Sequence, residues 1–178
     1  MRKIVGLIVV ISLLLVGISS CSGYNKNMRD HLSDPENYRT YEAVLTDMCY
    51  VDPKTREEFR DFKNTDFLGY DVILFVKFET VETVSKFLGG QPNPDIPLDE
   101  FQFALTIPVE NSEILYENGF YTDIALGEKI CVRSSDWVYM DGDFFYIAQL
   151  EYNHTVYLSF EAGLKNIIEM LQKNKSLF

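Results

Sequence analysis

The segment Asp71–Glu79 constrains the fold more than any other part of the chain, because its composition permits little but a strand. It reads Asp-Val-Ile-Leu-Phe-Val-Lys-Phe-Glu, a near-continuous run of β-branched and aromatic side chains. Phe101–Pro108 also predicts a strand, since apolar residues alternate along it, and Tyr41–Val51 predicts a long first strand. The chain holds 13 Phe and 11 Tyr, which favour strands. We therefore expect a β-rich core.

Further elements follow from capping and turn residues. Val81–Leu88 predicts a short helix capped by Thr80, although this segment could equally extend the preceding strand. Another short helix is expected with Asn111 or Ser112 as its cap and Gly119 as its left-handed stop. The remaining predictions are a strand at 129–133, a hairpin formed by 144–152 and 155–160, and a closing amphipathic helix at 161–173.

This order of elements resembles the OB-fold, in which three strands, a helix and two more strands form a Greek-key barrel. The passage Asn118-Gly119-Phe120, followed by Gly127-Glu128-Lys129-Ile130, is similar to the helix-to-fourth-strand connection of OB-like domains. The resemblance covers roughly Tyr41 to Tyr152. It implies an OB-like five-stranded barrel with an added strand and a C-terminal helix. The alternative is an α+β sandwich, in which the C-terminal helix packs on a curved antiparallel sheet.

The N-terminus has the pattern of a secretory signal. Two basic residues are followed by Ile4–Ile18, which contains no charge. As a helix, these 15 or so residues would span roughly 22 Å, less than the roughly 30 Å of a hydrocarbon core. Ile18-Ser19-Ser20-Cys21 resembles the lipobox of bacterial lipoproteins. The resemblance implies that Cys21 is acylated and becomes the N-terminus, although an ordinary cleaved signal or a short membrane anchor is the alternative.

These patterns divide the chain into three parts. Residues 1–20 are the expected signal peptide, residues 21–37 a tether with a short helical segment, and residues 38–178 a single globular domain. Arg2 and Lys3 are the only charged residues among the first 20, so the rest of the chain holds 14 of the 16 basic residues and all 27 acidic ones. This acidity argues against a nucleic-acid partner and against electrostatic adhesion to anionic lipid.

Two cysteines follow Cys21 in the chain, Cys49 and Cys131. Outside the cytoplasm they could form a disulfide. The bridge would close a loop of about 80 residues and stabilise the fold by up to roughly 4 kcal/mol. An OB-like barrel would place the two residues on neighbouring strands. The alternative is two buried free thiols.

The chain carries no sequence motif for catalysis. It has no Gly-x-Ser-x-Gly elbow, no Ser-x-x-Lys, no His-Glu-x-x-His, no paired Cys-x-x-Cys and no phosphate-binding Gly-rich loop. With only two histidines, nothing clusters as a zinc site would require. We therefore predict no catalytic residue, no metal and no cofactor. The acidic residues Asp95, Asp99 and Glu100, and likewise Asp136, lie in loops that could bind calcium but lack EF-hand spacing.

One loop stands out as a candidate ligand site. It contains the only tryptophan, Trp137, together with Tyr139, Asp141 and Asp143. An aromatic loop of this kind could stack on a sugar ring or grip a partner. Alternatively, Trp137 closes one end of the core, and Asp141-Gly142-Asp143 is a tight turn.

These features together predict a binding or interaction module, anchored by lipid on the extracytoplasmic face of the cell membrane. Its expected partners are the membrane and an envelope glycan or protein. A lipobox followed by one small acidic domain is similar to small lipoproteins of Gram-positive bacteria. Two alternatives stay open: a small hydrolase of envelope polymers that uses paired carboxylates, and an accessory subunit of a membrane complex.

Overall fold

The computed structural model describes residues 29–52, 54–55, 57–62, 69–88, 97–98, 101–135 and 145–173. The expected signal peptide and Cys21 lie outside these residues. So does the candidate ligand loop with Trp137, Tyr139, Asp141 and Asp143, and so do the loop residues Asp95, Asp99, Glu100 and Asp136.

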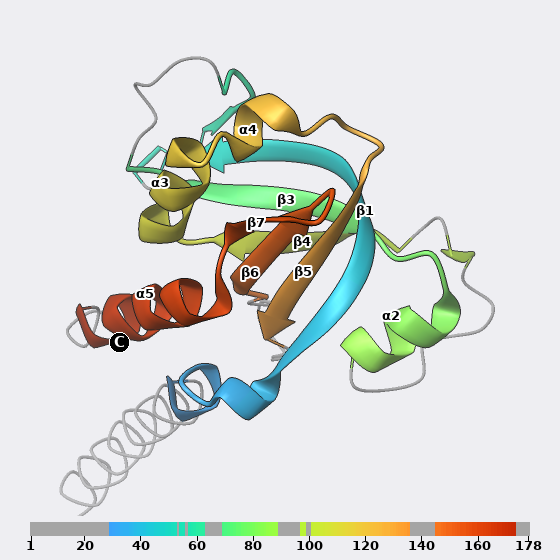
Figure 1. The fold of residues 1–178 in the computed structure, drawn as a ribbon, viewed down its shortest axis with the longest axis horizontal. Helices are drawn as coiled ribbons and strands as arrows, with labels where there is room; N and C mark the ends of the chain where they lie inside the picture. The colour runs from blue at the N-terminus through green and yellow to red at the C-terminus, as the bar shows by residue number, and fades with distance from the viewer. Residues whose placement is uncertain are drawn as a thin grey trace, which may run out of the picture.

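The long first strand, β1 (Tyr38–Val51), organises the sheet. Its first half pairs with β5 (Lys129–Ser135), and its second half pairs with β3 (Asp71–Lys77). The register shifts between Leu45 and Asp47, and an irregularity of this kind bends a strand. Figure 1 shows β1 curving through the molecule. One strand can therefore pair with two partners that leave it in different directions.

Within the described residues, seven strands form one sheet in the order β4-β3-β1-β5-β6-β7, with β2 paired to β1. The remaining strands are β2 (Glu58–Phe59), β4 (Phe103–Ile107), β6 (Ile147–Tyr152) and β7 (Thr155–Leu158). All these pairings are antiparallel. One isolated parallel bridge joins Thr106 to Tyr146, where the Thr106 amide donates to the Phe145 carbonyl at 2.8 Å. The predicted β-rich α+β class is confirmed.

The helices are short except for the last. A helical stretch at 29–32 and the 3-10 helix η1 (Pro35–Asn37) precede β1. The other helices are α2 (Val81–Phe87), α3 (Val109–Glu117), α4 (Phe120–Asp123) and α5 (Phe160–Lys173). Thr80 caps α2 as predicted, because its Oγ1 accepts the Thr83 amide at 3.1 Å. Val81–Leu88 is therefore a helix and not an extension of the strand.

The predicted cap of α3 is wrong. Pro108 occupies the N-cap position without a side-chain hydrogen bond, and Asn111 and Ser112 lie inside the helix, where both are buried. The Asn111 side chain bonds to β6 and the Ser112 hydroxyl to Tyr121 of α4, so neither caps the start of its own helix. Gly119 does end the helix with φ of +80°, as predicted, and α4 follows directly as an additional turn.

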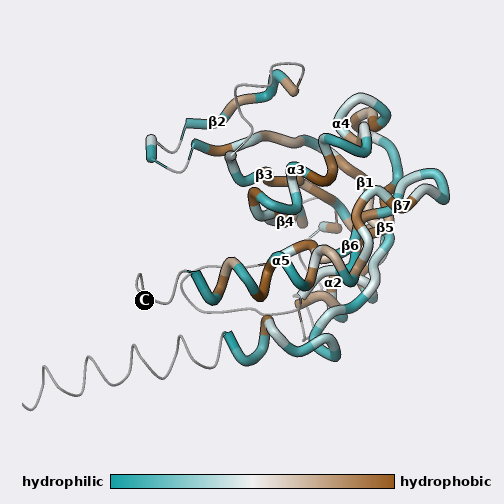
Figure 2. Tube along the Cα trace, turned by 60° about the vertical axis from the view of Figure 1, so that its left-hand side comes forward, coloured by the Kyte–Doolittle hydropathy of each residue, from teal (hydrophilic) through white to brown (hydrophobic). Residues whose placement is uncertain are grey.

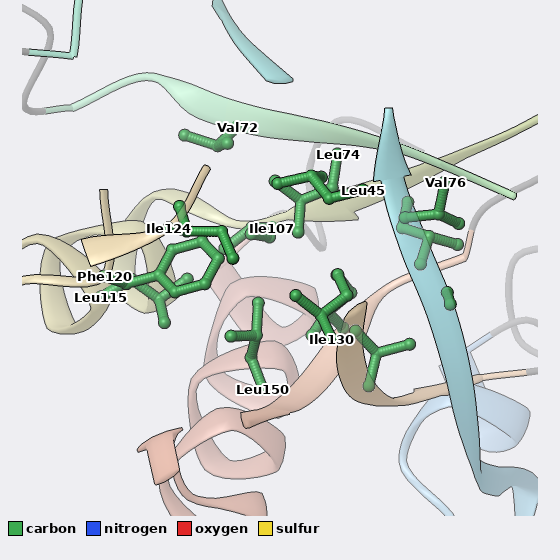
Figure 3. Close-up of a cluster of buried hydrophobic side chains, with 14 of the residues drawn as sticks. Leu45, Val72, Leu74, Val76, Ile107, Leu115, Phe120, Ile124, Ile130 and Leu150 are labelled. Carbon is green, nitrogen blue, oxygen red and sulfur yellow. The ribbon is translucent and has the colours of Figure 1, made fainter. Parts of the chain in front are cut away.

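The main core lies between the strands and is closed at its ends by helices. Leu45, Leu74, Ile107, Ile130 and Leu150 are almost completely buried there, and Figure 3 shows their side chains converging from several strands. At one end, the α2 residue Phe87 lies 4.2 Å from Phe145 and 5.1 Å from Tyr41 between ring centroids. At the other end, α3 and α4 contribute Leu115 and Phe120.

A second, smaller core lies between α5 and the outer side of β6. It combines Ala148 of β6 with Leu164 and Ile167 of α5, and with Leu32 and Tyr38 from the start of the described chain. Figure 2 shows hydrophobic and hydrophilic turns alternating along α5, as its amphipathic sequence requires. Because Leu32 is fully buried, the helical stretch before β1 packs on the sheet. Among the described helices, none has the length and apolar character to cross a bilayer.

Candidate functional site

The outer surface of β1, β3 and β4 carries a mixed apolar and polar face. In this register Cys49 lies opposite Ile73, and Asp47 lies opposite Phe75. Across β3, Ile73 pairs with Thr106 and Phe75 with Ala104. We call these six residues the outer face, within which Cys49 is covered and completely buried. The β3 residues that point inward are fully buried, whereas Ile73 and Phe75 are only half-buried.

Arg60 borders the outer face and forms ion pairs with two carboxylates. The guanidinium of Arg60 lies 3.0 Å from Asp47 and 3.0 Å from Glu58. The Asp47 hydrogen bond is the largest influence that raises the pKa of Arg60. All three side chains are between one third and about half exposed, so the pairs contribute little to stability. Their effect is to place hydrogen-bonding groups of both signs beside Phe75 and Cys49.

Thr46 and Gln102 form hydrogen bonds across the same surface. The Thr46 hydroxyl donates to the Phe75 carbonyl at 2.9 Å and accepts from the Gln102 amide at 2.6 Å. Thr46 sits at the irregularity of β1, between Leu45 and Asp47, which turns its side chain toward β3. The strand irregularity that bends the sheet therefore also sets the position of the groups beside Phe75.

Cys49 and Cys131 are free thiols, which is the alternative that the sequence left open to a disulfide between them. Cys131 lies opposite Glu42 on β1, whereas Cys49 lies seven residues further along the same strand. The seven residues from Glu42 to Cys49 span about 23 Å of strand, well beyond the Cα distance of a disulfide. Burial, followed by nearby Glu58, raises the pKa of the Cys49 thiol to about 11. Burial also raises the pKa of Cys131, so both thiols are protonated and unreactive at neutral pH.

An aromatic cluster fills the connection between β1 and β3. Tyr50 contacts Phe62 edge-on at 4.6 Å and stacks on Phe59 at 6.1 Å between ring centroids. Phe62 in turn stacks on Tyr121 of α4 at 4.9 Å, and Tyr70 lies 6.4 Å from Phe59. Phe59 is 40% exposed. This aromatic cluster therefore closes one end of the core and leaves one ring accessible to solvent.

The structure describes the residues on either side of the sequence-predicted ligand loop. Its preceding strand, β5, ends at Ser135, which pairs with Tyr38 at the start of β1. The chain is described again from Phe145, which packs in the main core. Trp137, Tyr139, Asp141 and Asp143 themselves lie outside the described residues. Their role as a ligand loop stays a prediction.

Sequence reasoning missed the outer face. The run Asp71–Glu79 reads as a strand buried on both sides, because Ile73 and Phe75 are as apolar as their inward neighbours. The available signal was Asp71 and Lys77, which lie an even number of residues from Ile73 and Phe75 and therefore share their side of the strand. Among the described residues, no three His, Cys, Asp or Glu side chains are grouped so that they could hold a metal ion.

Comparisons with protein-family models, with curated proteins and with solved structures give no match for this chain.

Proposed function

We propose that the chain is a lipid-anchored binding module of the cell envelope, and that its outer face binds a glycan. The observation that carries the proposal is Phe75, a half-buried aromatic ring on a sheet surface, with Asp47 directly opposite it and Arg60 paired to Asp47. An aromatic ring with hydrogen-bonding groups at its edge suits a sugar, which is apolar on its ring face and polar at its hydroxyls.

We further propose that the sheet is an OB-like barrel. The strand pairings support this, because β1 pairs with β3 and β5, β3 with β4, and β5 with β6. The parallel bridge between Thr106 and Tyr146 then joins β4 to β6. In the proposed barrel this bridge closes the series β4-β3-β1-β5-β6 into a ring. In chain order α3 and α4 follow β4, the third strand of the ring, and precede β5, the fourth. β7 and α5 are the added strand and helix.

An OB-like barrel narrows the expected ligand to two chemical classes. OB-folds bind oligonucleotides and oligosaccharides on the face of their second and third strands, which here are β3 and β4. The chain has a formal charge of −11, and a nucleic-acid ligand would require a concentrated positive field. An uncharged or amino-bearing glycan avoids this repulsion and is therefore the better ligand.

Calorimetric titration of the detergent-solubilised full-length protein with soluble N-acetylglucosamine oligomers, which carry no charge, tests the glycan proposal. Phe75→Ala should weaken binding at least tenfold, as removal of a central aromatic contact does. Val156→Ala is the matched control, because Val156 is 50% exposed on β7, and it should bind as the wild type does. Equal affinity of the two variants, or no binding by the wild type, contradicts the proposal. Release of shorter products would favour the hydrolase alternative.

The anchor is tested by mass spectrometry of the protein extracted from membranes. We expect a mature chain that begins at Cys21 and carries acyl chains, since two chains hold a protein stably at a bilayer. An unmodified Cys21, or a mature chain that begins elsewhere, would contradict the lipoprotein proposal.

A further inference from the structure

A hollow of about 380 Å³ lies between the first half of β1 and helix α2. Its β1 side is formed by residues 39–42, and its α2 side by residues 79–80 together with Thr83 and Lys86. The hollow exists because α2 packs on the end of the core through Phe87 and Val84. The polar side of α2 therefore faces β1. Its size is that of a site for a small ligand.

Charges of both signs line this hollow. Arg39 and Lys86 supply cations, and Glu42 and Glu79 supply carboxylates. Glu79 pairs with Lys129 at 2.8 Å, and Lys86 pairs with Glu82 at 2.7 Å. All four of these paired side chains are at least half exposed. Such exposed pairs are weak and can be exchanged for a ligand group at little cost.

A second hollow of about 430 Å³ shares Glu79 and is mainly apolar. Val44, Phe78 and Leu98 line it, together with Lys77. Glu79 therefore stands between a charged hollow and an apolar one. A ligand that filled both would carry separated positive and negative groups and one apolar side chain.

We propose that these two hollows form a binding site for a short zwitterionic peptide with an apolar side chain. The peptide ammonium lies against Glu79 and Glu42, its carboxylate lies against Arg39 and Lys86, and its side chain fills the apolar hollow. Arg39 and Glu42 both line the hollow, and their backbone positions are three residues apart, about 10 Å along a strand, which is the length of an extended tripeptide. This site is separate from the outer face and does not depend on glycan binding there.

The tripeptide Leu-Gly-Gly, whose apolar side chain lies at the ammonium end, tests the proposal when it is titrated into the full-length protein in detergent and followed by calorimetry and by amide chemical shifts. We expect saturable binding with shift changes at Thr40 and Thr83. Blocking both peptide termini, or replacing its leucine with serine, should weaken binding at least fivefold. Glu79→Gln should weaken it to a similar degree. Glu117→Gln, an exposed change on α3, is the matched control and should leave the affinity unchanged.

Three results would overturn the proposal. The first is the absence of saturable binding up to about 10 mM peptide, a concentration well above a dissociation constant of about 1 mM. The second is equal affinity of Glu79→Gln and Glu117→Gln. The third is a set of shift changes centred on Ile73 and Phe75. Both substitutions lie on exposed side chains, and unchanged thermal midpoints would show that the variants remain folded.

Discussion

The Asn166 side-chain amide donates a hydrogen bond to Oδ1 of Asn111 at 2.9 Å, between two helices and the sheet. The Asn111 amide nitrogen in turn donates to the carbonyls of Ile147 and Gly163, at 3.4 Å and 3.2 Å. Asn111 is completely buried. One polar side chain therefore joins α3, β6 and α5, and it positions the C-terminal helix on the sheet.

Replacing Asn111 with alanine should destabilise the protein by about 3 kcal/mol, because it removes this set of hydrogen bonds and leaves buried partners unsatisfied. Urea unfolding followed by circular dichroism measures the change. Glu113→Ala, an exposed substitution on the same helix, should change stability by less than about 0.5 kcal/mol. A loss below about 1 kcal/mol for Asn111→Ala would show that the hydrogen bonds are not needed.

Gly163→Ala should also destabilise the protein, although the same change within a helix normally stabilises it by about 1 kcal/mol. A Cβ at residue 163 would lie 2.0 Å from the Ala148 carbonyl oxygen, so α5 would have to move away from β6. We expect a net loss of about 2 kcal/mol in urea unfolding. Gln172→Ala, at an exposed position of α5, serves as the control and should be nearly neutral. A stabilised Gly163→Ala variant would contradict the close packing of α5.

The β6–β7 turn should become more stable when His154 is replaced by glycine. Asn153 and His154 have φ of +50° and +62°, the left-handed conformation of a two-residue type I′ turn, which prefers Asn-Gly. We expect a gain of about 1 kcal/mol, measured as a higher urea midpoint. His154→Ala keeps a Cβ and should not stabilise. The same effect from both variants would mean that the turn strain is not the cause.

Stability should decline with rising pH between about 9 and 11, and Cys49 should contribute to the decline. Burial raises the thiol pKa from 9.0 to about 11, so the folded protein keeps a proton that the unfolded chain loses above pH 9. The unfolded state then binds fewer protons, and stability falls as pH rises. Urea unfolding at pH 8, 9, 10 and 11 should show a steeper decline for wild type than for Cys49→Ala, with a difference approaching one proton. Parallel curves for the two proteins would show that Cys49 does not contribute to the decline in stability.

Replacing Cys21 with alanine should move the protein from the membrane fraction to the soluble fraction. Under the lipoprotein proposal the variant cannot be acylated, and an acidic chain is not attracted electrostatically to anionic lipid. Fractionation followed by immunoblotting measures the distribution. Cys131→Ala is the matched control, since it removes a thiol that has no part in anchoring, and it should remain with the membranes. Retention of Cys21→Ala in the membrane fraction would indicate another means of attachment.

The strands and helices were largely predictable because each depends on local pattern. The aromatic run at Asp71–Glu79, the cap at Thr80 and the stop at Gly119 all depend on a few neighbouring residues. The structure has a strand at Asp71–Lys77, the helix capped by Thr80 that was one of two alternatives, and the helix end at Gly119. Asn111 was misassigned as a cap because capping propensity is local, whereas its actual partners lie 36 to 55 residues away along the chain.

The sequence by itself determined the β-rich class, the positions of most elements and the chemistry available to them, because periodicity, turn residues and composition act over short distances. Only the tertiary structure decided which strands are neighbours and which surfaces stay exposed. It placed Cys131 of β5 opposite Glu42, seven residues from Cys49 along β1, and it placed Phe75 opposite Asp47 on a half-exposed face. It also set α2 beside β1, so that Glu79 lies between two hollows. These relations depend on register and strand curvature, which arise only when distant segments pack against one another.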